Sequence, residues 1–305
     1  MLLASAPVLS LTSRLVNGVL AIKPLADLMK RRARAIMIRR AESVGVHWTQ
    51  EVQALRARDW TEDFVQVQNP KLTYPEYYLR PFHAYEQGNL CWDAAFEVEV
   101  AAYAAHARVW SEASAQGDTR LRQSFNEFLK AHLSQPPQRI LDLGCSVGMS
   151  TMALQEAFGQ AQVIGLDLSA YYLAVAHYRA QVRGIVLKWL HSTAETTGLP
   201  DGSMDLVTAC LLCHELPQQA TLAILQEAHR LLAPGGHFAL MDMNPRSEVY
   251  AKMPPYVLTL LKSTEPYLDE YFSLDLEQAI VQAGFALPTV TKLSPRHRAV
   301  VAQVR

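Results

Sequence analysis

The stretch Ile140-Leu-Asp-Leu-Gly-Cys-Ser-Val-Gly-Met-Ser150 combines a short apolar strand, a turn with two glycines and the start of a helical pattern. Glycine permits so tight a turn because it adopts positive φ without steric cost. A helix that begins near Gly148 directs free N–H groups and the positive end of its dipole at the turn. Asp167 ends the next apolar run, Val163–Asp167, where a carboxylate can accept both hydroxyls of a ribose. We therefore predict a pocket for a nucleoside-bearing cofactor.

The glycine spacing separates this pocket from two other nucleotide sites. Gly144 and Gly148 form G-x-x-x-G, whereas dinucleotide sites use G-x-G-x-x-G, and no lysine follows Gly148 as a P-loop requires. The segment Asp142-Leu-Gly-Cys-Ser-Val-Gly148 instead resembles motif I of the class I S-adenosylmethionine-dependent methyltransferases, D-x-G-x-[GS]-x-G. The resemblance implies S-adenosyl-L-methionine as the cofactor.

Two later stretches resemble further blocks of the same family. Leu199-Pro-Asp-Gly-Ser-Met-Asp-Leu-Val207 is similar to the L-P-x-x-x-F-D-x-V segment that leads into the fourth strand. Leu231-Leu-Ala-Pro-Gly-Gly236 is similar to the L-x-P-G-G turn before the fifth. The resemblance covers residues 135–305 and is closest to the small-molecule branch that includes the ubiquinone and menaquinone methyltransferases.

Strand and helix patterns alternate through this half of the chain, which predicts an α/β fold with a doubly wound parallel sheet. The patterns predict strands at 139–143, 162–167, 186–190, 204–210, 236–242, 286–294 and 297–304. They predict helices at 148–159, 170–183, 217–233 and 274–283. The resemblance implies a Rossmann-like, seven-stranded sheet that ends in an antiparallel hairpin. We expect two parts: a mainly helical, aromatic-rich extension over 1–134 and a methyltransferase domain over 135–305.

The resemblance also assigns residues to parts of the cofactor. The methionine part is expected to be surrounded by Asp142, Gly144, Ser146 and Gly148. Asp167 is expected to take the ribose hydroxyls, and Leu168 to lie against the adenine. Thr193-Ala194-Glu195 occupies the adenine edge. Ala194 and Glu195 are therefore expected to contact the cofactor, and the adenine amino group is left to either Glu195 or a backbone group.

His214 is the candidate catalytic residue. In the family the end of the fourth strand faces the methyl group, and an imidazole titrates near neutrality, which suits a general base. The alternative is a structural histidine that caps the following turn, and Glu215 is a second candidate for the base. Cys210-Leu-Leu-Cys213-His214 matches the haem-attachment pattern C-x-x-C-H, but its place at a strand end argues against haem or redox use. Ligands for a zinc site are not apparent, so no metal is expected.

The segment from Tyr74 to Trp92 is rich in aromatic residues, which a simple linker does not need. Its candidates for a lid or an acceptor contact are Tyr77, Tyr78, His83 and Tyr85. The alternative is an aromatic collar that joins the extension to the domain. In the second half of the extension, helices are predicted from Leu90 to about Ala115 and from Arg120 to Leu133.

Composition limits the partners. The 305 residues carry a formal net charge of −1, so the broad basic surface of a nucleic-acid-binding protein is not expected. Four cysteines in a chain of this length do not indicate a disulfide framework and favour a reducing compartment. No uncharged apolar run reaches the length of a bilayer span. We therefore expect a cytoplasmic protein.

Charge is distributed unevenly along the chain, with basic residues concentrated near its N-terminus. Residues 9–45 are expected to be helical, interrupted at Pro24, with one apolar and one basic face. Such a segment can lie on an anionic membrane, which would make the protein membrane-peripheral, or it can pack on the domain with a solvated basic face.

The predicted activity is methyl transfer by in-line displacement to a small, rather apolar acceptor of quinone-like, phenolic or isoprenoid character. Transfer from a sulfonium depends mainly on orientation and exclusion of water, so it requires no fixed catalytic residue and leaves the acceptor unspecified. Two alternatives stay open. One is a protein methyltransferase that docks a protein partner on its extension, and the other is a non-catalytic, cofactor-binding assembly or regulatory protein.

Overall fold

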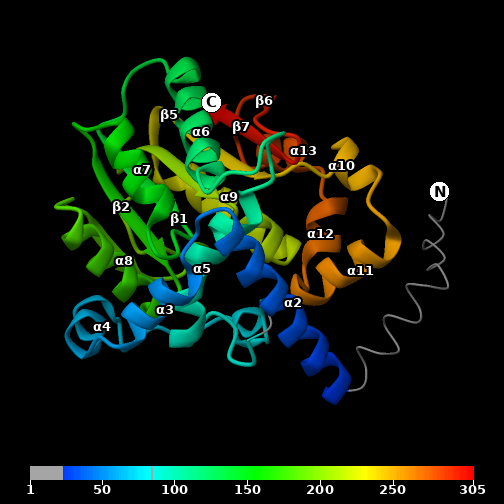
Figure 1. Ribbon diagram of the computed structural model, residues 1–305. Helices are drawn as coiled ribbons and strands as arrows, with labels where there is room; N and C mark the ends of the chain where they lie inside the picture. The colour runs from blue at the N-terminus through cyan, green and yellow to red at the C-terminus, as the bar shows by residue number, and fades with distance from the viewer. Residues whose placement is uncertain (1–22, 84) are drawn as a thin grey trace.

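A seven-stranded sheet forms the centre of the computed structural model, which describes residues 23–83 and 85–305 (Figure 1). The strand order is β3-β2-β1-β4-β5-β7-β6. The strands are β1 (Arg139–Leu143), β2 (Gln162–Asp167), β3 (Lys188–His191), β4 (Met204–Cys210), β5 (Leu232–Met243), β6 (Thr289–Lys292) and β7 (His297–Gln303). The Rossmann-like α/β fold predicted from the sequence is confirmed.

Strands β1 to β5 pair in parallel, and β7 is antiparallel to both of its neighbours. β1 lies between β2 and β4, so the order reverses around it. The carboxyl ends of these three strands meet at one edge of the sheet, which is where ligands bind in open α/β sheets. β7 is inserted between β5 and β6, and it pairs with β5 from His237↔Gln303 to Met243↔His297.

Helices cover both faces of the sheet. On one face, Ile140 packs with side chains of α6 (Gly117–His132) and α7 (Met149–Ala157). On the other, Leu141 and Leu143 pack with α9 (Gln218–Leu231) and α13 (Leu276–Gln282). Successive strand residues point to opposite faces, so one apolar run supplies both cores.

The N-terminal extension is helical and shares a core with the domain. Besides α6, its elements are α2 (Lys23–Ser43), α3 (Trp48–Arg56), α4 (Thr61–Val67), the 3₁₀ helix η1 (Glu76–Leu79) and α5 (Trp92–His106). Trp48, Trp60 and Phe96 are buried in one cluster with Tyr172 and Leu173 of α8 (Ala170–Val182). The extension is therefore packed onto the domain.

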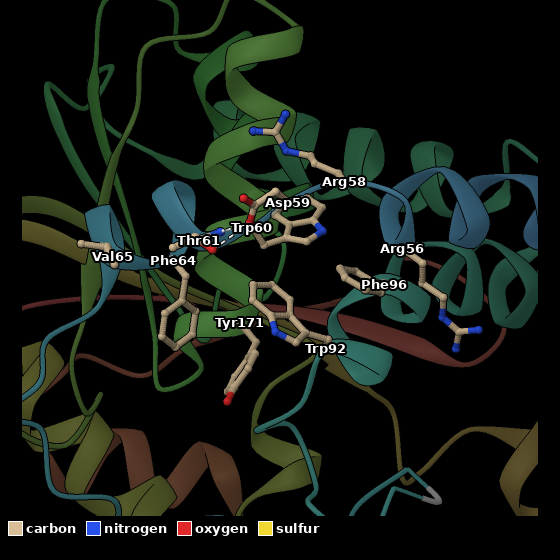
Figure 2. A pocket seen from close by; sticks show the side chains of 10 residues that line it. All are labelled: Arg56, Arg58, Asp59, Trp60, Thr61, Phe64, Val65, Trp92, Phe96 and Tyr171. Atoms are coloured by element: carbon tan, nitrogen blue, oxygen red, sulfur yellow. Dashed lines mark hydrogen bonds between the residues drawn. The ribbon is translucent and has the colours of Figure 1, made fainter.

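The aromatic side chains of the extension surround a cavity of about 500 Å³ (Figure 2). Trp92 stacks on Phe96 with ring centroids 5.5 Å apart and meets Tyr171 edge-on at 4.9 Å. Arg56 at the rim pairs with Asp93. These contacts join α5 to α8, as expected for an aromatic collar, and none of the predicted cofactor residues lines this cavity.

Several element boundaries differ from those predicted. Within the described residues α2 runs unbroken from Lys23 to Ser43, so Pro24, at its beginning, does not interrupt it. Residues 9–22 lie outside the described part. The helix predicted over 90–115 covers only Trp92–His106. β5 starts earlier than predicted because Leu232 already pairs with Met204.

Short helices escaped the sequence analysis because fewer than three turns give little periodicity. They are α3, α4, η1, a second 3₁₀ helix η2 (Cys213–Glu215), α10 (Glu248–Ala251), α11 (Pro255–Thr264) and α12 (Leu268–Ser273). Within residues 23–83 and 85–305, no helix combines the length and apolar character needed to cross a bilayer.

Candidate active site

Asp142 holds the turn after β1 in place. Its side chain is fully buried and accepts hydrogen bonds from Ser150 (2.6 Å) and Thr151 (2.7 Å) of α7 and from Thr208 of β4 (2.9 Å). Burial raises the pKa of Asp142, whereas the three hydroxyl donors lower it. The sequence placed Asp142 beside the methionine part of the cofactor, and the structure places its carboxylate inside the packing between β1, β4 and α7.

The two motif glycines have no room for a side chain. Gly144 and Gly148 have φ of +62° and +80°, in the left-handed region. A Cβ on Gly144 would lie 2.5 Å from Leu212, and one on Gly148 would lie 2.6 Å from the Trp189 ring. α7 starts directly after Gly148, and no side chain of the described residues caps its first amides. The turn therefore presents free N–H groups at the carboxyl end of β1.

Asp167 ends β2 as a buried carboxylate held by backbone amides. Its Oδ2 accepts from the N–H of Ser146 (2.7 Å), and its Oδ1 from the N–H of Ser169 (2.8 Å). Burial raises its pKa to about 6, against the lowering effect of these amides and of a hydrogen bond from Tyr78. With Ser146, Ser169 and Tyr78 donating, the carboxylate keeps one lone pair, and a ligand that displaces the Tyr78 hydroxyl gains a second. The site thus suits a pair of ligand hydroxyls.

The lid candidates Tyr77 and Tyr78 sit in η1 above this edge of the sheet. The Tyr78 hydroxyl reaches Asp167. The Tyr77 hydroxyl donates to Oε1 of Glu195 at 2.6 Å. Burial, together with the neighbouring Glu195 carboxylate, raises the pKa of Tyr77, so this hydroxyl stays protonated and donates. The two tyrosines therefore bring the extension over both the ribose and the adenine ends of the predicted pocket.

Two buried polar atoms beside these groups have no hydrogen-bond partner among the described residues. They are Oγ of Ser146 and Oε2 of Glu195. Unpaired polar atoms are costly when buried, and they commonly mark the place of a ligand or water. Leu168 follows Asp167 in the sequence and Ala194 precedes Glu195; both side chains are buried and supply apolar surface. The donor and acceptor set of Ser146, Asp167 and Glu195 fits a cofactor with amino, hydroxyl and adenine groups.

His191 is a positioning residue that the sequence analysis missed. Its Nδ1 accepts from the N–H of Asn69 at 2.9 Å, and its Nε2 lies 2.9 Å from the carbonyl of Leu168. Burial lowers the pKa of His191, so it is neutral and donates through Nε2 to Leu168. One imidazole thereby fixes the backbone after Asp167 to the extension.

Asn89 forms a second such anchor. Its carbonyl accepts from Oγ of Ser169 (2.7 Å), and its Oδ1 accepts from the hydroxyl of Tyr172 (2.9 Å). Ser169 also caps α8. Because Ser169 donates its amide to Asp167, the extension and the ribose carboxylate are held through one residue.

His214 lies in η2, after β4, and its Nδ1 is 2.7 Å from Oδ1 of Asp242. Burial lowers the pKa of His214, but the adjacent Asp242 carboxylate outweighs this and raises it to about 10. The imidazole is therefore charged near neutral pH and does not offer a free base. This environment favours a cationic role over the general base expected from the sequence.

The side chains of His83 and Tyr85 contact different parts of the structure. Nε2 of His83 lies 2.9 Å from Glu265 and 3.6 Å from Glu215, at the β4 end of the site. Tyr85 instead donates to Oε2 of Glu97 at 2.7 Å, a carboxylate that Arg34 of α2 also binds. Tyr85 thus anchors the extension, whereas Tyr78 and His83 face the two ends of the site.

Both cysteines of the C-x-x-C-H string are buried. Cys210 ends β4 and Cys213 begins η2. Burial raises the pKa of both thiols, so neither is a reactive thiolate near neutral pH. This position agrees with a structural role.

Comparison with known proteins finds methyltransferases among the relatives of this chain. The family described as "Methyltransferase domain" matches residues 140–236. A demethylmenaquinone methyltransferase of Thermus thermophilus is 33% identical over 113 residues, which are 37% of this chain and half of that protein. A Synechocystis protein described as an uncharacterized methyltransferase is 32% identical over 153 residues, 50% of this chain and 68% of that protein.

A solved structure shares the fold. The phosphoethanolamine N-methyltransferase 2 of Haemonchus contortus, in complex with S-adenosyl-L-methionine, superposes with a TM-score of 0.55 over 76% of this chain and 60% of its own, at 14% identity. The seven-stranded sheet and its strand order define a Rossmann-like α/β protein. The chain belongs to the S-adenosylmethionine-dependent methyltransferase family.

Proposed function

We propose that this protein transfers the methyl group of S-adenosyl-L-methionine to a small, rather apolar acceptor of quinone-like, phenolic or isoprenoid character. One observation carries the proposal. The buried Asp167 carboxylate, the unpaired Ser146 Oγ and the unpaired Glu195 Oε2 gather where the parallel strands end. The name of the Thermus relative, demethylmenaquinone methyltransferase, supports a quinone-like acceptor.

The chain's own residues divide the work of holding the cofactor. Asp167 would accept the ribose hydroxyls, while the free amides at the start of α7 and Ser146 would meet the methionine part. Glu195, oriented by Tyr77, would accept from the adenine amino group. When bound, the cofactor supplies a methyl group on a sulfonium, which an in-line nucleophile displaces. Tyr77 and Tyr78 would exclude water from above.

The acceptor would lie at the β4 end. Cys213, Met243, Tyr250, Leu268 and Tyr271 form a buried apolar cluster there. α11 presents partly exposed apolar side chains, with Tyr256 47% exposed. This surface supports an apolar acceptor. The charged His214 would stabilise a negative acceptor oxygen, so His214→Asn is expected to lower kcat while the cofactor Kd stays unchanged. Unchanged kcat would contradict that role.

The rival functions receive less support. Docking of a protein substrate on the extension requires an apolar surface patch. Between residues 46 and 115, in the described part, the large hydrophobic side chains with high exposure are Val65 and Leu79, which are single residues. A purely cofactor-binding role predicts binding without turnover.

Calorimetry with S-adenosylmethionine and S-adenosylhomocysteine tests the first half of the proposal, and transfer of a labelled methyl group to quinones, phenols and isoprenoids tests the second. We expect micromolar binding and transfer to at least one of these classes. Binding without transfer to any of them would favour the non-catalytic role. Failure to bind either compound would overturn the proposal.

We also propose that α2 contacts an anionic membrane. Its surface carries Arg31, Arg32, Arg39 and Arg40 together with exposed Ile36. Each basic side chain near such a surface contributes about 1 kcal/mol. Replacing the four arginines by glutamine should therefore weaken binding to anionic liposomes by on the order of 100-fold or more. The control Arg246→Gln should not, and binding that survives the fourfold change would remove this proposal.

A further inference from the structure

Three side chains from separate segments meet beside the acceptor end of the site. His83 follows η1, Glu215 ends η2 and Glu265 follows α11. Nε2 of His83 is 2.9 Å from Oε1 of Glu265 and 3.6 Å from Oε1 of Glu215. One nitrogen and two carboxylate oxygens, one from each residue, all lie within 4.8 Å of one another. The sequence does not predict this cluster, because long stretches of chain separate its members.

The cluster is rich in acceptors and poor in donors. Glu265 is 8% exposed, and no hydrogen-bond partner contacts its Oε2 among the described residues. Among the described side chains, His83 is the one that pairs with these two carboxylates, so one imidazole faces four oxygens. Leaving a buried carboxylate oxygen unpaired is costly. An ion pair with His83 alone therefore does not satisfy this site.

The backbone also holds His83 in an uncommon conformation. Its φ is +47°, in the left-handed region, and its N–H donates to the carbonyl of Thr264 at 3.3 Å. Thr264 precedes Glu265, so this bond brings the two ligand residues together. The imidazole is aimed between the carboxylates by its backbone as well as by its side-chain contacts.

We propose that His83, Glu215 and Glu265 form a binding site for a divalent cation. Imidazole nitrogen with two carboxylate oxygens suits ions such as Mn²⁺, Zn²⁺ or Fe²⁺. Two ligands that are each about 2.1 Å from one ion lie about 3 to 4 Å apart, so the observed spacing needs only a small closure. Cation binding would neutralise the carboxylates and pair the free Oε2 of Glu265.

The location would let the cation bind an oxygen of the acceptor. Leu212, three residues before Glu215, packs against Gly144 of the cofactor turn, so η2 adjoins the pocket. Three protein ligands leave coordination positions open for an oxygen of the acceptor. This use rests on the proposed function, whereas cation binding itself does not.

The test uses the full-length chain freed of metal with a chelator. Calorimetry with Mn²⁺ and with Zn²⁺, and the EPR spectrum of Mn²⁺, report binding. We expect one ion per chain, nitrogen coupling from His83 in the pulsed EPR spectrum, and a higher Tm with the metal. Glu265→Gln, Glu215→Gln and His83→Gln should each weaken binding by at least about 10-fold. The exposed Glu62→Gln is the matched control and should bind as the wild type does.

Binding of S-adenosylhomocysteine by every variant separates loss of the ion from loss of the fold. If the wild type binds neither Mn²⁺ nor Zn²⁺, or if the three variants bind them as the wild type does, the cation site is overturned. Metal binding without S-adenosylhomocysteine binding would leave the cation site standing and overturn the proposed function. Pyrocatechol, which has two adjacent hydroxyl oxygens, should change the spectrum of bound Mn²⁺; an unchanged spectrum would overturn the acceptor role alone.

Discussion

The hydroxyl of Tyr77 donates a 2.6 Å hydrogen bond to Oε1 of Glu195, although 118 residues separate the two along the chain. Tyr77 belongs to the extension, and Glu195 to the adenine edge of the family's domain. The contact leaves Oε2 of Glu195 without a partner among the described residues. The extension therefore orients the carboxylate that we propose as the partner of the adenine amino group.

Replacing Tyr77 by phenylalanine tests this orientation. Loss of one hydrogen bond costs about 1 kcal/mol, so the Kd for S-adenosylhomocysteine should rise by about 5-fold. Tm should change little, because Glu195 is only partly buried and water can replace the hydroxyl. The exposed Tyr256→Phe is the control. An unchanged Kd in the Tyr77 variant would mean that Glu195 does not depend on Tyr77.

Asp167→Asn is expected to impair cofactor binding far more. An amide cannot accept from both ribose hydroxyls while Ser146 and Ser169 donate to the same group. Hydrogen bonds to a charged acceptor contribute about 1.5–3 kcal/mol each, so affinity should fall on the order of 100-fold by calorimetry. Removal of the exposed carboxylate in Glu156→Gln should leave affinity unchanged. If Asp167→Asn and Glu156→Gln bind the cofactor with equal affinity, Asp167 does not hold the ribose hydroxyls.

The same carboxylate predicts a pH dependence of cofactor binding. Burial raises the pKa of Asp167 to about 6, so the group is charged above that pH and neutral below it. Affinity for S-adenosylhomocysteine should therefore decrease as the pH falls from 7 to 5. The contribution of Asp167 to folding stability changes in the opposite direction. Between about pH 4 and 6 the folded chain binds this proton more tightly than the unfolded chain, so the free energy of unfolding rises as the pH falls through this range. Asp167→Asn should flatten this part of the affinity profile; an equally steep profile would assign the effect to another group.

Asn89 should matter for stability. Its substitution by alanine leaves the buried Tyr172 hydroxyl unpaired, which costs about 1–3 kcal/mol of unfolding free energy. Denaturant unfolding of Asn89→Ala, Tyr172→Phe and the double variant measures this contact directly. The effects should be non-additive, since either single change removes the same hydrogen bond. Strict additivity would show that the bond contributes nothing.

The sequence predicted those features that depend on neighbours along the chain. The apolar run before Gly144 and the one before Asp167 are local patterns, and both became parallel strands ending at one edge. His191 and Asn89 were missed for a physical reason. His191 bonds to Asn69, 122 residues away, and Asn89 to Tyr172, 83 residues away. No periodicity encodes such pairs.

Which of the candidate side chains reach the site also depends on contacts in three dimensions. Tyr78 and Tyr85 lie seven residues apart in the same aromatic segment, yet of the two only Tyr78 interacts with Asp167. Tyr85 turns to Glu97 because that carboxylate lies one turn into α5. Likewise the sequence made His214 a candidate base, and it could not show that Asp242, at the end of the neighbouring strand β5, keeps it charged.

The place of β7 has a consequence for synthesis of the chain. Residues 297–303 follow every other strand, yet they lie inside the sheet, against Phe238–Met241 of β5. A chain still emerging from the ribosome therefore carries β5 with one edge open and apolar. Unpaired edges of this kind associate with other chains, so chaperone protection and aggregation should concentrate in the interval before β7 arrives. The strands whose carboxyl ends carry the proposed site are therefore made before β7, the strand that closes the open edge of β5.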